Sequence, residues 1–189
     1  MPLLGAGDPL PSRPHRVLVA GTSGAGKTTL AGAVAETLGY PYVELDSLHH
    51  GPGWTRRPEF EEDVGRVVAG SRWVSEWQYE AVRELLLDRA DCLIWLDLPR
   101  ALVTARVVRR TLRRRVRREV LWNSNMEPPL RTFFSDPDHI VRWAWRTHPR
   151  TRDRVLAVLA TRPMLPVVRL RSPAEVARWV AGPLRTTVG

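Results

Sequence analysis

Lysine is almost absent from this 189-residue sequence: of its 29 basic residues, 28 are arginine and one, Lys27, is lysine. Isoleucine and asparagine each occur only twice. This composition indicates a coding bias that favours arginine over lysine, and Lys27 is the one position that departs from it. Because Lys27 lies in a glycine-rich segment, that segment is the first candidate for a functional site.

Cysteine and long apolar runs are also scarce. Cys92 is the only cysteine, so an internal disulfide is impossible and a reducing, cytoplasmic setting is expected. No apolar run approaches the roughly 20 residues that a membrane-spanning helix needs. The first 14 residues lack the basic start and apolar centre of a signal peptide. We therefore expect no membrane association.

The formal net charge of +9 is concentrated in one stretch. Residues 106–118 contain eight arginines and no acidic residue, and without these eight charges the net charge would be +1. A broad basic surface is typical of nucleic-acid binding, whereas a local cluster indicates a local anion site. The cluster is followed by no stacking aromatic side chain until Trp122, so nucleic acid is a possible partner but not the favoured one.

Short apolar strands alternate with helical segments along the chain. We predict strands at 15–20, 42–46, 73–75, 92–96 and 167–170, and helices at 27–38, 58–69, 79–89, from 100 through the arginine cluster, 139–159 and 173–180. This alternation predicts a three-layer α/β fold, a five-stranded parallel sheet with helices on both faces. Residues 1–14 contain four prolines and are expected to form a flexible tail. We expect 15–189 to form a single domain with a small helical lid inserted at about 106–138, and 123–138 to be irregular.

One motif predicts a phosphate-binding site. Residues 21–28 read GTSGAGKT and match G-x-x-x-x-G-K-[ST] completely, between a predicted strand and a predicted helix. In such a P-loop, backbone N–H groups surround the β-phosphate, the lysine reaches the β- and γ-phosphates and the hydroxyl residue binds Mg²⁺. We therefore predict an ATP site, with Lys27 in catalysis and Thr28 as the Mg²⁺ ligand. The predicted ATP-binding residues of the loop are Gly21, Thr22, Ser23, Gly24, Ala25, Gly26, Lys27, Thr28 and Thr29.

The same loop occurs in several classes of protein. A GTPase would carry an N-K-x-D motif, which the single lysine excludes. A larger ATPase would normally have an Asp–Glu pair at the end of a strand, and residues 92–99 (CLIWLDLP) do not end in that way. A kinase is the leading interpretation. A nucleic-acid-acting protein (a polynucleotide-end kinase or an ATP-gated DNA binder) and a non-catalytic nucleotide sensor stay open.

Residues 96–99 (LDLP), with Arg106 and Arg110 downstream, resemble the adenylate-kinase-like nucleotide kinases. The resemblance implies that Arg106 lies near adenine and that Arg110 contacts phosphates. Adenylate kinases also hold an acceptor monophosphate with two arginines, and the corresponding places here contain His49 and residues 76–79 (EWQY). The acceptor group is therefore expected to be a hydroxyl, with a nucleoside monophosphate as the alternative.

A closer resemblance extends over residues 15–180. The segments 45–54 (LDSLHHGPGW), 71–79 (SRWVSEWQY) and 142–150 (RWAWRTHPR) resemble bacterial kinases of the "DNA topology modulation protein" type. Residues 46–49 (DSLH) are also similar to the D-x-L-H segment of gluconate kinases, and the chain has some resemblance to gluconate and shikimate kinases.

Candidate residues for the acceptor side follow from their predicted places. Asp46, at the expected carboxyl end of a strand, is the predicted general base. Glu76 follows the third strand and is predicted to bind Mg²⁺ through a water molecule. With Lys27 and Asp46, Arg106 and Arg110 complete the predicted catalytic set. The predicted substrate-binding residues are Asp46, His49, Trp54, Glu76, Gln78, Arg142 and Arg146.

The sequence thus predicts a cytoplasmic kinase that depends on ATP and Mg²⁺. It would transfer the γ-phosphate of ATP to a small-molecule acceptor, with a hydroxyl as the expected receiving group. The predicted partners are the nucleotide and this acceptor, and the protein is expected to be a monomer or a homodimer.

Overall fold

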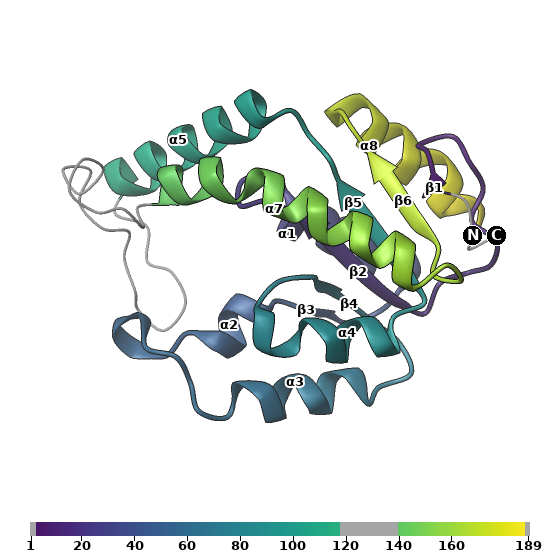
Figure 1. Ribbon diagram of the computed structural model, residues 1–189, viewed down its shortest axis with the longest axis horizontal. Helices are drawn as coiled ribbons and strands as arrows, with labels where there is room; N and C mark the ends of the chain where they lie inside the picture. The colour runs from purple at the N-terminus through teal and green to yellow at the C-terminus, as the bar shows by residue number, and fades with distance from the viewer. Residues whose placement is uncertain (1–2, 118–139, 188–189) are drawn as a thin grey trace.

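The structure, a computed structural model, describes residues 3–117 and 140–187; of residues 54, 114–117 and 140–147 it describes the backbone only. In the described residues a parallel sheet of six strands has the order β1-β6-β5-β2-β4-β3 (Figure 1). The strands are β1 (Leu3–Leu4), β2 (Arg16–Gly21), β3 (Tyr42–Val43), β4 (Trp73–Glu76), β5 (Cys92–Leu96) and β6 (Val167–Leu170). The helices are α1 (Lys27–Leu38), α2 (Leu45–His49), α3 (Phe60–Val68), α4 (Arg83–Arg89), α5 (Arg100–Arg117), α7 (Ile140–Thr161) and α8 (Pro173–Trp179), with short turns η1 (Pro52–Trp54), η2 (Glu80–Val82) and η4 (Val180–Leu184).

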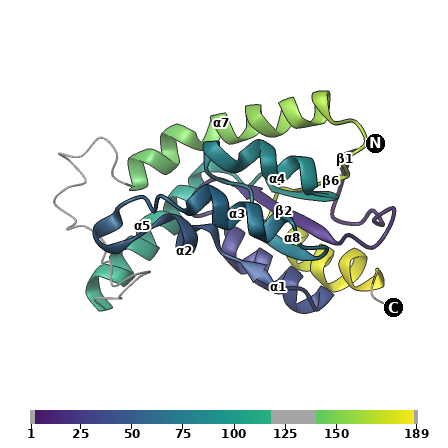
Figure 2. The same ribbon diagram turned by 90° about the horizontal axis from the view of Figure 1, so that it is seen from below.

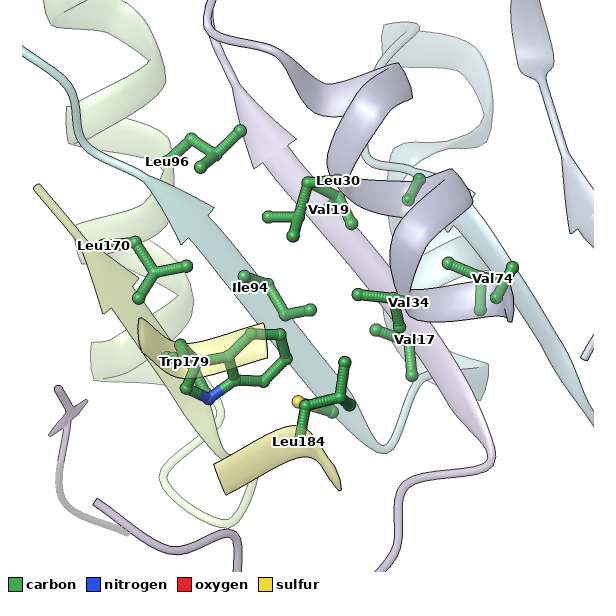
Figure 3. Packing of buried hydrophobic residues seen from close by; sticks show 14 of the residues in the cluster. Val17, Val19, Leu30, Val34, Val74, Ile94, Leu96, Leu170, Trp179 and Leu184 are labelled. Atoms are coloured by element: carbon green, nitrogen blue, oxygen red, sulfur yellow. The ribbon is translucent and has the colours of Figure 1, made fainter. Parts of the chain in front are cut away.

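Helices cover both faces of the sheet, as Figure 2 shows: α1 and α8 lie on one face, and α3, α4 and α7 on the other. Successive residues of a strand point to opposite faces. The sheet therefore has two hydrophobic cores, one on each face. Val17 and Val19 of β2 pack in the first core, with α1 and α8. Leu18 and Ala20 pack in the second core, with α3, α4 and α7. Trp179 of α8 closes the first core (Figure 3). The predicted three-layer α/β fold is confirmed.

The predicted number of five strands is wrong. The additional strand, β1, consists of Leu3 and Leu4, which pair with Val167 and Val168 of β6. It lies in the segment that we expected to be a flexible tail. Proline is tolerated beside an edge strand, because such a strand needs hydrogen bonds on one side only. The prolines of 1–14 therefore did not prevent this pairing.

The predicted strand at 42–46 is shorter than expected. Only Tyr42 and Val43 pair with β4, and the chain then turns into α2 at Leu45. Leu45 is fully buried and fixes this short helix to the second core. Asp46 therefore lies in the first turn of a helix and not at the end of a strand, which corrects our prediction.

Two long helices flank the part of the chain that the structure does not describe. The predicted helix from residue 100 is present as α5, and the helix predicted at 139–159 is present as α7, which continues through Pro149. The predicted lid beyond residue 117, including 123–138, lies outside the described residues. Among the helices that are described, none has the length and apolar character needed to cross a membrane.

Candidate functional site

The predicted P-loop connects β2 to α1. β2 ends at Gly21 and α1 begins at Lys27. Gly24 and Gly26 have φ angles of 82° and 99°, which other residue types adopt only with strain. No described side chain caps the start of α1, so its first N–H groups and its positive dipole end are available to an anion. The loop therefore fits the phosphates of a nucleotide.

A buried carboxylate lies behind this loop. Glu76 is 2% exposed and accepts hydrogen bonds at Oε1 from the Thr28 hydroxyl (2.7 Å) and the Tyr42 hydroxyl (2.9 Å). Lys27 Nζ lies 3.9 Å from Glu76 Oε2. Burial, and then the charge of Glu76, raise the pKa of Tyr42 above its ordinary range, so Tyr42 stays a hydrogen-bond donor. Hydroxyl and carboxylate oxygens are ligands that Mg²⁺ prefers, so Thr28 and Glu76 could hold this ion.

Helix α5 packs directly on the P-loop. A Cβ atom at Gly24 would lie 2.3 Å from Val107 Cγ2 and 3.0 Å from the Val103 carbonyl oxygen. Arg106 donates a hydrogen bond to the carbonyl of Ala25 in the loop (3.2 Å). Arg106 therefore lies beside the predicted nucleotide site, and Arg110 follows one turn later on the same helix. Their roles toward the nucleotide stay predictions.

A second group of side chains surrounds Asp46. Gln78 Nε2 donates to Asp46 Oδ1 at 2.7 Å, and the Tyr79 hydroxyl donates to the same oxygen. The Tyr79 hydroxyl also lies 3.1 Å from His50 Nε2, and its ring stacks on His49 with 4.0 Å between centroids. The structure thus brings together three predicted residues, Asp46, His49 and Gln78. Tyr79 and His50 were not predicted as site residues, although the segments 45–54 and 71–79 that carry the family resemblance contain them.

Burial shifts the pKa of two members of this group, Tyr79 and His49. Burial, and then the charge of Asp46, raise the pKa of Tyr79 above its ordinary range. Burial, and then the charges of His50 and Arg56, lower the pKa of His49, and Asp46 opposes this shift. Tyr79 and His49 are therefore both neutral at neutral pH.

Four consecutive residues, 76–79, connect the two groups. Glu76 contacts Thr28 of the loop, whereas Gln78 and Tyr79 contact Asp46. Between them, the Trp77 ring is buried and its Nε1 donates to the Arg83 carbonyl at 3.2 Å, which anchors the segment. Both groups thus belong to one candidate site at the carboxyl edge of the sheet, where ligands bind in open α/β folds.

The remaining predicted residues fall into two classes. Asp97, which follows β5 in the LDLP segment, accepts a hydrogen bond from Arg169 Nε (2.8 Å) and lies 3.9 Å from Arg152. The side chains of Trp54, Arg142 and Arg146 lie outside the described part of the chain.

Comparison with protein families gives the wider relationship. The model of the "ATPase family associated with various cellular activities (AAA)" matches residues 17–122, which is more than half of the chain. The chain belongs to this AAA family. The match includes the P-loop, the 76–79 segment and α5, so the whole described part of the candidate site lies within the family's P-loop domain. No curated protein matches the sequence significantly.

Comparison with solved structures concerns the fold. A gluconokinase from Sinorhizobium meliloti 1021 matches with a TM-score of 0.52 and 20% identity, over 94% of this chain and 95% of that chain. A shikimate kinase from Acinetobacter baumannii, in complex with shikimate, has a TM-score of 0.40 and 18% identity, over 78% of this chain and 94% of that chain. The gluconokinase similarity shows that this AAA-family chain has the α/β architecture of a P-loop kinase.

Proposed function

We propose that this protein is a kinase that transfers the γ-phosphate of ATP to a hydroxyl group of a small-molecule acceptor. The observation that supports the proposal best is the 76–79 segment. It joins a P-loop with its own buried carboxylate, Glu76, to a second carboxylate, Asp46. One carboxylate suits a metal ion and the other suits an acceptor hydroxyl.

The residues of the loop fit the donor side of this reaction. ATP supplies the phosphoryl group, and Mg²⁺ neutralises part of the phosphate charge when both are bound. Lys27 would bind the β- and γ-phosphates, and Thr28 would hold the ion directly and Glu76 through water. Arg106 and Arg110 stabilise the charge that develops on the transferred group.

Asp46 is the proposed general base. As the acceptor oxygen forms its bond to the γ-phosphorus, the bond from that phosphorus to the bridging oxygen breaks and ADP leaves. The hydroxyl proton passes to Asp46. His49 and Gln78 line the same group in the structure, and Trp54, Arg142 and Arg146 are further acceptor residues proposed from the sequence alone.

Among the described residues, the two arginines nearest to α2 in the sequence support a hydroxyl acceptor over a phosphate. Arg56 forms an ion pair with Glu61, and Arg57 lies 3.1 Å from Asp63. These two arginines follow α2 in the sequence, and each is matched by an acid. A phosphate acceptor needs positive groups, whereas a hydroxyl needs a proton acceptor.

The identity of the acceptor, the type of kinase and the cellular setting belong to the same proposal. The gluconokinase relative makes gluconate a reasonable first acceptor to test. The resemblance to kinases of the "DNA topology modulation protein" type and the cytoplasmic setting stay predictions from the sequence.

The test is a screen with γ-labelled ATP and Mg²⁺. The panel contains gluconate, shikimate, neutral sugars and polyols, nucleosides, nucleoside monophosphates and DNA with 5′-hydroxyl ends. We expect label on a hydroxyl of a small molecule. Asp46→Asn should lower kcat by about 10²–10⁴-fold, the value of general-base help, with nearly unchanged ATP affinity.

Asp88→Asn is the matched control, because Asp88 is an exposed partner of Arg162 on the surface and should leave kcat unchanged. Transfer only to nucleoside monophosphates or only to DNA would contradict the proposal. So would release of inorganic phosphate without a labelled acceptor in any reaction of the panel, which indicates an ATPase.

A further inference from the structure

The hydrogen bonds around Asp46 continue beyond the side chains that touch it. The Tyr79 hydroxyl connects Asp46 Oδ1 to His50 Nε2, and His50 Nδ1 lies 3.4 Å from His49 Nδ1. Four side chains thus form one chain of hydrogen bonds, His49–His50–Tyr79–Asp46. Phosphoryl transfer with Asp46 as the base does not by itself require the three outer members.

The backbone at Tyr79 is strained. In the described residues Tyr79 is the only non-glycine residue with a positive φ, 60°. A bulky side chain adopts this conformation only where its surroundings hold it, and such positions concentrate at functional sites. Here Tyr79 is held by stacking on His49, by an edge contact with Phe60 and by its bond to Asp46.

The number of hydrogens on each side chain determines which residue is the donor in each bond of this series. Tyr79 has one hydroxyl hydrogen, and it goes to Asp46 because an ionised carboxylate is the stronger acceptor. The Tyr79 oxygen must then accept from His50, so Nε2 of His50 carries a hydrogen. In the neutral form of its ring His50 has only one N–H, and in that form its Nδ1 is an acceptor. The hydrogen in the His49–His50 bond therefore comes from Nδ1 of His49.

The neutrality of two members supports this assignment. Burial lowers the pKa of His49 and raises the pKa of Tyr79. Each can therefore donate one hydrogen along the chain without carrying a charge. Bonds in such a series polarise one another, so the bond from Tyr79 to Asp46 is strengthened by the two behind it.

We propose that His49, His50 and Tyr79 are positioning residues for Asp46. Their donors run in one direction, from His49 to His50 to Tyr79 to Asp46, and with Gln78 they hold Oδ1 of the carboxylate. In the described part of the protein Oδ2 accepts no hydrogen bond, so it is the oxygen left for the acceptor hydroxyl. This function of the three residues rests on the proposed function, but the hydrogen-bond chain itself does not.

The first test examines the hydrogen bonds of this series and needs no measurement of phosphoryl transfer. Nitrogen NMR of the full-length, ¹⁵N-labelled protein at about pH 8, above the ordinary histidine pKa, reports which ring nitrogen carries hydrogen. Single His→Gln variants assign the signals. We expect His50 as the Nε2–H tautomer and His49 as the Nδ1–H tautomer. Tyr79→Phe should release His50 into a mixture of tautomers. A wild-type His50 with hydrogen on Nδ1, or a His50 unaffected by Tyr79→Phe, would overturn the proposal.

The second test asks whether Tyr79 acts through Asp46. The reaction is hydrolysis of γ-labelled ATP, because water is an acceptor that needs no identification, and transfer to whichever acceptor the screen identifies is measured in parallel. Tyr79→Phe should lower kcat by about 10- to 100-fold, as loss of a hydrogen bond to a charged group does. ATP affinity should not change. In an Asp46→Asn background Tyr79→Phe should cause no further loss, whereas a merely structural Tyr79 would lower kcat equally in both backgrounds.

His50 provides a matched pair of variants. His50→Gln keeps an N–H donor for Tyr79 and should keep most of the rate, whereas His50→Leu removes the donor and should resemble Tyr79→Phe. Equal losses in the two variants would contradict the chain. The failures can be told apart: full activity of Asp46→Asn refutes the proposed base, whereas a slow Asp46→Asn beside a fully active Tyr79→Phe refutes only the positioning residues.

Discussion

The contact between α5 and the P-loop can be tested with a single methyl group. Gly24→Ala would place its Cβ 2.3 Å from Val107 Cγ2 and 3.0 Å from the Val103 carbonyl oxygen. The Val107 side chain is fully buried and the carbonyl belongs to the helix backbone, so neither can move alone. The substitution should therefore push α5 away from the loop.

The expected cost has two parts. An L-residue in the left-handed conformation costs about 1–2 kcal/mol, and Gly24 has a φ of 82°. Overpacking a tight contact adds about 1–3 kcal/mol. Gly39→Ala is the matched control, since Gly39 has a φ of 71° but no atom within 4 Å of the added Cβ. In the control the free energy of unfolding should fall only by the cost of the left-handed conformation, about 1–2 kcal/mol.

Equilibrium unfolding in urea measures both variants, and the free energy of unfolding should fall further for Gly24→Ala. Removing the Val107 methyl groups in the double variant Gly24→Ala/Val107→Ala should recover part of the second cost, because the shortest contact disappears. Equal destabilisation by Gly24→Ala and Gly39→Ala would refute the packing of α5 on the loop. Binding of a fluorescent ATP analogue to both variants then shows whether this contact also supports the nucleotide site.

Three further predictions concern stability and reactivity. Gly32→Ala, inside α1 with no atom within 4 Å of the new Cβ, should raise the free energy of unfolding by about 0.5–1 kcal/mol in urea; a loss would contradict the open space at this position. Because the pKa of His49 is lowered in the folded protein, the unfolded chain binds more protons below about pH 6.5 and stability falls as the pH drops through that value. His49→Gln should flatten this part of the curve of unfolding free energy against pH, and an unchanged slope would contradict the shift. Burial, and then the charge of Asp91, raise the pKa of Cys92 to about 12, so a thiol reagent should modify it only after unfolding; rapid modification of the native protein would show that the strand is not buried.

The P-loop and α1 could be predicted because their signals are local. The glycine spacing, the apolar strand before it and Gly39 after the helix all lie within 25 residues of the sequence. In the structure Gly39 has a φ of 71° and its N–H bonds the carbonyls of Ala35 and Glu36, the expected end of a helix. Local pattern and tertiary structure agree here.

The acceptor side depends on contacts that are distant in the sequence. Only Tyr42 and Val43 pair with β4, and Leu45, which is fully buried, then begins α2. The residue pattern of 42–46 does not contain this information, and by itself it suggested a longer strand. Tyr79 meets Asp46 across 33 residues of the sequence, and its backbone has an unusual positive φ. No residue pattern encodes that contact. β1 was missed for a related reason, since two leucines form a strand only when β6 is present beside them.

Lys27 allows the most direct measurement of the central claim. Its Nζ lies 3.9 Å from Oε2 of Glu76, the last residue of β4, and every other basic residue of the chain is arginine. Lys27→Arg keeps the charge but replaces a compact ammonium with a planar fork, and Lys27→Ala removes the charge. With γ-labelled ATP and the acceptor panel, we expect the wild type to form a labelled phosphate ester on a hydroxyl and both variants to lose it while staying folded. Transfer at the wild-type rate in Lys27→Ala, or label found only as inorganic phosphate in the wild type, would contradict the account.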